Sequence, residues 1–124
     1  MSTADLAQRI EWIEAGYEYL LAYAAQGRRD DTGSDARRML TQMQTALDGL
    51  GAEVGRAFAG SARESAAFFE AVAQDARVAS GAIALVLDRA SISSLLVDNL
   101  NASVHLRALL TDLFLIDQAL KTAD

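Results

Sequence analysis

The sequence predicts an all-α protein: an antiparallel up-down-up-down four-helix bundle formed by a single domain over residues 1–124. Three observations predict this class. Alanine and leucine, both strong helix formers, dominate the composition, and proline is absent. Apolar residues recur at spacings of three and four in four successive segments, and no window alternates with period two. A chain of 124 residues corresponds to one domain, and short turns between long helices favour antiparallel neighbours.

The first predicted helix covers residues 3–26. Ser2 and Asp5 have the spacing of a capping box at its start, and Gly27 is a typical residue just beyond a helix end. A charged loop over residues 28–33 follows it. The residues expected to face the core are Leu6, Ile10, Ile13, Tyr17, Leu20 and Ala24.

The second predicted helix covers residues 35–59, with Ser34 as its cap. Its core-facing residues are Ala36, Leu40, Met43, Leu47, Leu50, Val54 and Phe58. Gly49, Gly51 and Gly55 lie inside this helix, where each glycine costs roughly 1 kcal/mol relative to alanine. Either the helix is locally weak or bent, or the small residues Gly51, Gly55 and Ala59 allow another backbone to approach closely.

The third predicted helix covers residues 62–87 and the fourth covers residues 92–121. Ser61 and Glu64 have capping-box spacing before the third helix, whose core-facing residues are Ser65, Phe69, Val72, Ala76, Ala79, Ile83 and Val86. No glycine or proline marks the next boundary, which we place near residues 88–91 with Ser91 as the cap. The fourth core-facing set is Ile92, Leu95, Asn99, Ala102, Leu106, Leu109, Leu113, Ile116 and Leu120.

Two of the four helices carry more apolar residues than one core-facing stripe needs. The surplus residues are Trp12, Tyr19 and Tyr23 in the first helix and Val97, Leu100, Val104 and Leu115 in the fourth. A helix that is apolar on two sides must be covered on two sides, so these residues predict a homodimer interface on one or both helices. The alternative is that the helices splay and the same residues line a wider core.

The rest of these two helices is polar. The first carries an acidic ridge of Glu11, Glu14 and Glu18, which we interpret as exposed to solvent. The fourth has one polar edge, formed by Asp98, Asn101, His105 and Asp112.

Charge and composition argue against several partners and compartments. The formal net charge of −6 disfavours nucleic acid as the main partner, because binding to phosphates needs clustered Lys and Arg. The first residues lack the basic-then-apolar order of a secretion signal, and the longest uncharged stretch, residues 78–87, is too short to span a bilayer. With no cysteine in the chain, we expect a cytoplasmic protein that does not bind membranes.

Catalytic and metal-binding patterns are weak. The chain resembles small acidic helical phosphotransfer modules in size and charge, but those modules follow the reactive histidine with the order His-x-x-Lys-Gly. Here the order is His105-Leu106-Arg107-Ala108, which departs from it. A di-iron bundle needs Glu-x-x-His, and Ala102 stands three residues before the only histidine. We therefore predict no catalytic residue, no metal site and no cofactor.

These patterns predict a non-enzymatic helical interaction protein that acts through helix packing, such as an adaptor, a chaperone-like protein, an immunity protein or a regulatory subunit. A second hypothesis is a small-molecule-binding bundle, in which the small residues Ser65, Ala76 and Ala79 leave room for a ligand near Trp12 and the tyrosines. A third hypothesis is a phosphotransfer module that acts through His105.

Overall fold

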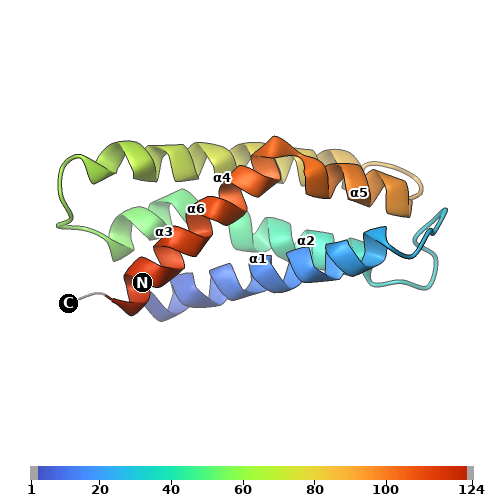
Figure 1. The fold of residues 1–124 in the computed structure, drawn as a ribbon, viewed down its shortest axis with the longest axis horizontal. Helices are drawn as coiled ribbons and strands as arrows, with labels where there is room; N and C mark the ends of the chain where they lie inside the picture. Colours follow the sequence, from blue (N-terminus) through green and yellow to red (C-terminus); the bar gives the residue numbers. More distant parts are fainter. Residues whose placement is uncertain (1–2, 123–124) are drawn as a thin grey trace.

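The protein is all-helical over residues 3–122, which the computed structural model describes, and no strand occurs among these residues. These residues form six helices where the sequence predicted four, because the second and fourth predicted helices are each divided in two (Figure 1). Their bounds are α1 Thr3–Ala24, α2 Ala36–Leu47, α3 Leu50–Ala57, α4 Ser65–Leu87, α5 Ser94–Ala102 and α6 Val104–Lys121. The predicted cap Ser2 lies outside the described residues.

The first interruption lies at Asp48 and Gly49, between α2 and α3. Asp48 is extended, with ψ 119°, and Gly49 has φ 73°, a left-handed conformation that glycine adopts without a steric penalty. Leu47 and Leu50 on either side of the break are both buried. The predicted core-facing set of this segment is therefore confirmed, although the single helix is not.

The second interruption lies at Ser103, between α5 and α6, where no glycine or proline marks it. Ser103 has φ −57° and ψ 128°, so its backbone is not helical. In α6 the predicted inward residues Leu106, Leu109, Leu113 and Ile116 are buried, as expected. In α5 the prediction was wrong: Leu95, Asn99 and Ala102 are exposed. The buried residues of α5 are Ser94, Val97, Leu100 and Asn101. A non-helical residue between two helices lets each one turn a different face to the core.

Helix ends depart from the predicted ends by a few residues. Ser93, rather than Ser91, caps α5, because its Oγ accepts a hydrogen bond of 3.0 Å from the backbone N–H of Leu96. α1 ends at Ala24, and Gly27 follows it with φ 65°. α4 begins at Ser65, three residues later than predicted.

Each helix buries its apolar side against neighbours in the chain. α1 packs against α2 and α5, and α4 packs against α2, α3 and α6. α6 crosses the front of the molecule in Figure 1, between α4 and α1, so α1 begins and α6 ends at the same end of the molecule. Two glycines allow close approach: a Cβ on Gly16 would overlap the side chain of Met43, and a Cβ on Gly51 would overlap Ala73. Close approach is thus confirmed at Gly51, but Gly55 faces open space.

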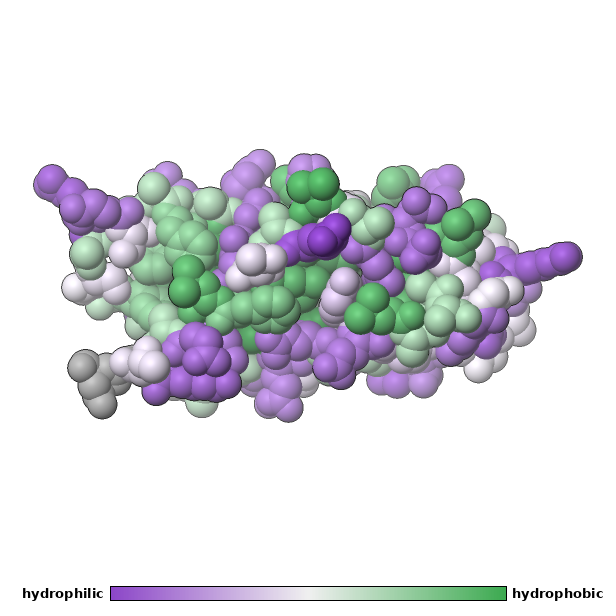
Figure 2. Space-filling model, in the orientation of Figure 1, coloured by the Kyte–Doolittle hydropathy of each residue, from purple (hydrophilic) through white to green (hydrophobic). Residues whose placement is uncertain are grey.

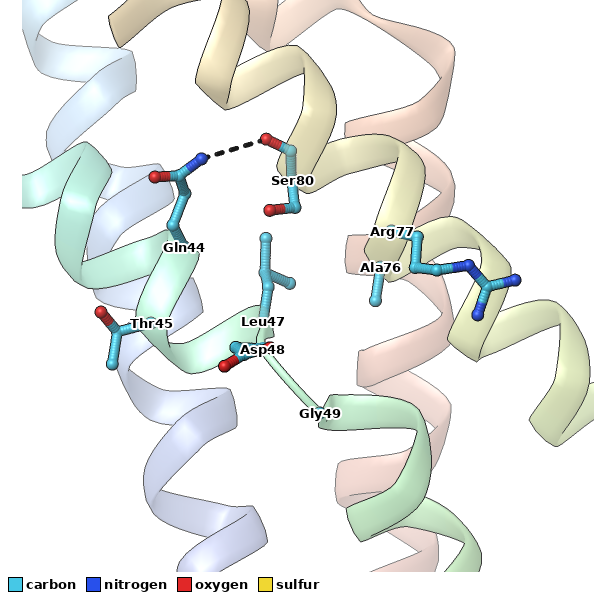
Figure 3. Close-up of a pocket in the computed structure, with 8 residues that line it drawn as sticks. All are labelled: Gln44, Thr45, Leu47, Asp48, Gly49, Ala76, Arg77 and Ser80. Atoms are coloured by element: carbon cyan, nitrogen blue, oxygen red, sulfur yellow. Dashed lines mark hydrogen bonds between the residues drawn. The ribbon is translucent and has the colours of Figure 1, made fainter.

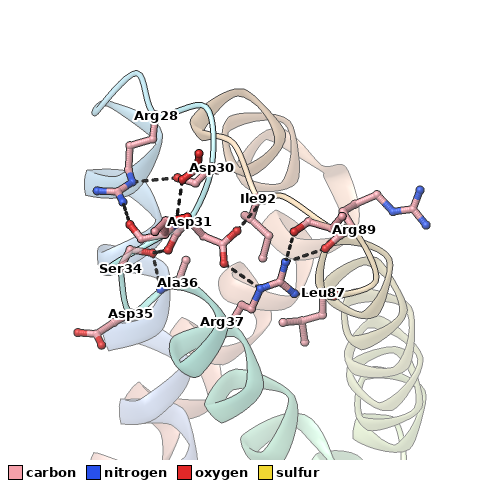
Figure 4. Close-up of polar contacts among 12 residues, drawn as sticks. Arg28, Asp30, Asp31, Ser34, Asp35, Ala36, Arg37, Leu87, Arg89 and Ile92 are labelled. Atoms are coloured by element: carbon pink, nitrogen blue, oxygen red, sulfur yellow. Dashed lines mark hydrogen bonds and ion pairs between the residues drawn. The ribbon is translucent and has the colours of Figure 1, made fainter.

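The opposite end is closed by a polar cluster that joins the α1–α2 connection to the α4–α5 connection (Figure 4). The guanidinium of Arg37 pairs with Asp31 at 2.8 Å and donates to the backbone carbonyls of Leu87 at 2.9 Å and Arg89 at 2.7 Å. The other carboxylate oxygen of Asp31 accepts a hydrogen bond of 2.9 Å from the backbone N–H of Ile92. This bond and, after it, Arg37 hold the pKa of Asp31 below its usual value, against the effect of burial.

Buried hydrogen bonds attach α1 to α5 next to this cluster. The hydroxyl of Tyr23 donates to the carbonyl of Ile92 at 2.6 Å, and the hydroxyl of Ser94 donates to the carbonyl of Tyr23 at 2.7 Å. The backbone N–H of Arg28 donates to Ser94 at 2.8 Å. The charged loop that follows α1 is therefore fixed to the rest of the fold. Across residues 3–122, each helix falls short of the length or the hydropathy that a bilayer span requires.

Candidate functional site

α6 is the helix whose outer side exposes the most large apolar residues. Its inner side packs on α4 and α1, and its outer side leaves Val104, Phe114 and Leu115 exposed by 74%, 53% and 60%. Phe114 and Leu115 are consecutive, so their side chains point about 100° apart around the helix axis. Each one stands at the edge of a separate hollow. Figure 2 shows the apolar atoms that gather on this face.

The first hollow, which we call the phenylalanine hollow, lies where the end of α3 and the start of α4 meet α6. Its volume is about 290 Å³, and it is lined by Phe58, Ser61, Ser65, Phe68, Phe69, Leu115, Ile116 and Ala119. Phe58 stacks on Phe69 with ring centroids 5.6 Å apart, and Phe68 contacts Phe69 at 6.1 Å. None of the lining residues is charged, so an apolar group can enter without desolvating an ion.

The second hollow, which we call the acidic groove, lies on the other side of α6, against α1. Its volume is about 270 Å³, and it is lined by Glu14, Tyr17, Glu18, Leu110 and Phe114. Leu110 is buried, Tyr17 and Glu14 are half-buried, and Phe114 and Glu18 are exposed. The groove therefore combines an apolar and aromatic wall with carboxylates from α1.

Negative charge in the acidic groove is only partly balanced. Asp117 of α6 pairs with Lys121 at 3.0 Å, but Glu14 and Glu18 form no ion pair with any described residue. Burial raises the pKa of Glu14 above its usual value, and the charge of Asp117 raises it further. Lys121 lowers the pKa of Glu14, and the charges of Glu18 and Glu11 raise it by smaller amounts. A cation bound in this groove would relieve the repulsion between these carboxylates.

A third hollow has a different character. It holds about 450 Å³ beside the interruption between α2 and α3, and Figure 3 shows that α2 and α4 form its walls. Its lining residues are Gln44, Thr45, Leu47, Asp48, Gly49, Ala76, Arg77 and Ser80. The amide of Gln44 donates to the carbonyl of Ser80 at 3.3 Å across it. Polar groups with bonds inside the chain line this hollow, and we assign it no function.

Only some of the predicted interface residues lie on the surface. Val104 and Leu115 are exposed, and Trp12 is 38% exposed beside a small hollow that Arg9 and Thr45 also line. Tyr19 is half-buried, stacks on the ring of Tyr23, and accepts a hydrogen bond of 3.1 Å from the backbone N–H of Asp35. Its hydroxyl therefore already has a partner within the chain.

Three predicted interface residues belong instead to the core. Tyr23 and Val97 are fully buried, and Leu100 is nearly so. The reason is that α1 and α5 pack against each other, so the surplus apolar sides of both helices cover one another inside a single chain. For these residues the alternative of a wider core was correct.

The predicted polar edge does not remain a single edge. Asp98 and His105 are exposed, but Asn101 is buried and donates to the carbonyl of Leu20 at 3.1 Å, and Asp112 is half-buried. The split falls within each helix, since α5 contains Asp98 and Asn101 and α6 contains His105 and Asp112. Asn101, rather than Asn99, is the buried asparagine. The side chain of His105 forms no hydrogen bond or ion pair with another described residue.

Asp112 of α6 and Asp75 of α4 form an acidic pair. Burial, together with a hydrogen bond to the Asp75 carboxyl and charge repulsion from it, raises the pKa of Asp112 to about 7. The buried Oδ2 of Asp112 has no donor among the described residues, so Asp75 can satisfy it only when one of the two acids is protonated.

The acidic pair predicts that stability falls as pH rises from about 4 to 7. The folded pKa of Asp112 is raised, so its stabilising effect is complete below the unfolded pKa of 3.8 and is lost as pH rises towards 7. After discounting for solvent screening, we expect a loss of about 1–2 kcal/mol. Urea unfolding of wild type and Asp112→Asn across this pH range measures it. Asp112→Asn should abolish most of the loss, whereas Asp98→Asn, at an exposed position, should retain it. A wild-type stability that rises with pH would contradict this assignment.

The phenylalanine hollow and the acidic groove were not found from the sequence. Tyr17 was assigned to the core, the glutamates were interpreted as a solvated ridge, and Phe114 was not singled out. One available signal was that Phe114 and Leu115 both lie outside the core-facing set of their helix. Within residues 3–122, His, Asp and Glu side chains do not gather in any group of three that could hold a metal ion. Comparison with protein-family models, curated proteins and solved structures gives no match to this chain.

Proposed function

We propose that this chain is a non-enzymatic helical interaction protein that binds through the outer side of α6, and that it forms a homodimer there. The observation that carries this proposal is Leu115, which stands 60% exposed at the rim of the uncharged phenylalanine hollow. In a two-fold dimer, Leu115 of each copy enters the hollow of the other copy, so the same contact forms twice. Burying a leucine side chain contributes about 1.5–3 kcal/mol.

Electrostatics favours this surface for self-association. Each copy carries a formal net charge of −6, so two copies repel one another over most approaches. The lining of the phenylalanine hollow contains no carboxylate, and contact there brings no acidic side chains of the lining together. Stacked aromatic rings with an aliphatic neighbour are also typical of the centre of a protein interface.

The proposal includes the antiparallel up-down-up-down bundle. α2 and α3 would together serve as one rod and α5 and α6 as another, with α1 and α4 as the remaining two. The packing of α1 on α2 and α5, and of α4 on α2, α3 and α6, is consistent with such a ring of four rods.

Sedimentation equilibrium tests the homodimer. We expect the wild type to sediment at twice the mass of one chain at micromolar concentration. Leu115→Glu places a charge in the hollow and should weaken association by at least about 30-fold, the change that corresponds to a loss of ~2 kcal/mol. The matched control is Leu85→Glu, which changes an equally exposed leucine near the other end of α4 and should leave association unchanged.

A wild type that stays monomeric at high micromolar concentration would reject the homodimer. The second candidate function, binding of an apolar small molecule, rests on the same hollow, since its volume of about 290 Å³ is close to the lower end for ligand pockets. Native mass spectrometry separates the cases: a doubled mass supports the homodimer, and one chain with a small added mass supports the ligand.

A further inference from the structure

The acidic groove on the α1 side of α6 has apolar walls, and none of the residues 3–122 covers them. Phe114 forms one wall, Tyr17 the other, and Leu110 the floor. One turn beyond Tyr17, Leu21 continues the apolar strip along α1 and is 48% exposed. Exposed apolar side chains that form a continuous strip beside a hollow are typical of a site where another helix packs.

The charge around this strip is mostly negative. Glu11, Glu14 and Glu18 are spaced by three and four residues, so they follow one line along α1 beside the groove. With Asp117 from α6 they bring four carboxylates to this region, and Lys121 is the cation paired there. In Figure 2 hydrophilic atoms border the apolar face along the lower edge, where α1 runs in Figure 1.

We propose that the acidic groove binds an amphipathic helix of another protein that presents arginine or lysine residues beside an apolar stripe. The apolar stripe would cover Phe114 and Leu21. The aliphatic stem of an arginine or lysine would pack on the ring of Tyr17 or Phe114, and its charged end would reach Glu14 or Glu18. A cation over an aromatic ring and beside a carboxylate gains from both contacts.

Charge complementarity distinguishes this partner from a second copy of the chain. A copy with a net charge of −6 brings more acid than base to a groove that is already acidic. The phenylalanine hollow, where we place the homodimer, shares no lining residue with the acidic groove, so the two contacts use different residues. The inference rests on the proposal that the chain acts through helix packing, and it does not require the homodimer.

The probe is a synthetic basic amphipathic helix of about 18 residues, or five turns, with a leucine stripe flanked by lysine and arginine. One control peptide keeps the leucines and replaces every basic residue with glutamate. Fluorescence anisotropy at low and high salt measures the dissociation constant for the full chain. We expect the basic helix to bind and the acidic control to bind at least about tenfold more weakly. High salt should weaken the binding of the basic helix.

Two pairs of variants assign the binding to the groove. Glu14→Gln combined with Glu18→Gln should weaken binding of the basic helix by at least about tenfold. Glu64→Gln with Glu70→Gln removes the same charge at exposed positions outside the groove and should change binding by less than about threefold. Phe114→Ser should weaken binding without changing the net charge. Circular dichroism of each variant checks that the helices are retained.

Three outcomes would overturn the inference: no binding of the basic helix, equal binding of the acidic control, or an equal loss in both pairs of glutamine variants. Leu115→Glu separates this result from the homodimer, because it should dissociate the dimer and still bind the basic helix. If the wild type is monomeric and binds the basic helix, only the homodimer proposal fails. If the wild type is dimeric and does not bind it, only this inference fails.

Discussion

Replacing Arg37 with methionine is expected to lower the free energy of unfolding by about 3 kcal/mol. The guanidinium pairs with Asp31 and donates to three backbone carbonyls, that of Leu87 at the end of α4 and those of Arg89 and Ala90 in the α4–α5 connection. A hydrogen bond from a charged donor contributes about 1.5–3 kcal/mol, and the partial exposure of this side chain reduces the sum. Methionine keeps most of the aliphatic stem but satisfies none of these carbonyls.

The neighbouring arginine provides the control for Arg37. Arg38 is more exposed and pairs only with Asp35, at 3.3 Å. A surface ion pair of this kind contributes little, so Arg38→Met should change stability by less than about 0.5–1 kcal/mol. Urea unfolding followed by circular dichroism measures both variants. Equal losses in the two would show that the polar cluster does not hold this end of the fold together.

Gly51→Ala and Gly55→Ala are expected to change stability in opposite directions, with a difference of about 1–3 kcal/mol. Both glycines lie in α3, where alanine is the better helix former by roughly 1 kcal/mol. At Gly51 the new Cβ would overlap the Cβ of Ala73 and lie 2.9 Å from its Cα, so the backbones of α3 and α4 must separate. Such overpacking costs typically 1–3 kcal/mol, more than the gain in helix propensity.

At Gly55 only the gain in helix propensity applies, because the added Cβ meets no neighbour. A Cβ there has no atom within 4 Å, so Gly55→Ala should stabilise the chain by about 0.5–1 kcal/mol. Thermal and urea unfolding of the two variants and the wild type give the sign of each change. If Gly51→Ala also stabilises, the close contact between α3 and α4 at Ala73 is not tight, and the spacing of Gly51, Gly55 and Ala59 reflects helix weakness alone.

Local patterns accounted for much of the fold. In α2, α3 and α4 most of the residues predicted to face the core are buried, and the others are half-buried. Regular spacing is enough to predict these residues, because an amphipathic helix has one apolar side and that side faces the core. Gly49 also indicated a weak point, which became the interruption between α2 and α3.

The candidate surfaces were predicted only in part, because their composition depends on which helices meet. Tyr23 and Val97 had the pattern of surplus surface residues, but α1 and α5 bury them against each other. Phe58, Phe69 and Leu115 lie far apart in the sequence and form one hollow only because α3, α4 and α6 converge. Leu115 was singled out from the sequence, and the phenylalanines around it were not.

The sequence by itself determined the all-helical class, most of the core-facing residues of 35–59 and 62–87, and the excess of apolar residues on the first and last helical segments. The tertiary structure alone decided which of those apolar residues stay exposed. No glycine or proline in the sequence indicates the non-helical backbone at Ser103. Because of it, α5 and α6 pack on the core with different sides. Spacing within a helix fixes the angle between its own side chains, but exposure depends on the neighbouring helix that covers each side, and that neighbour is set by packing over the whole chain.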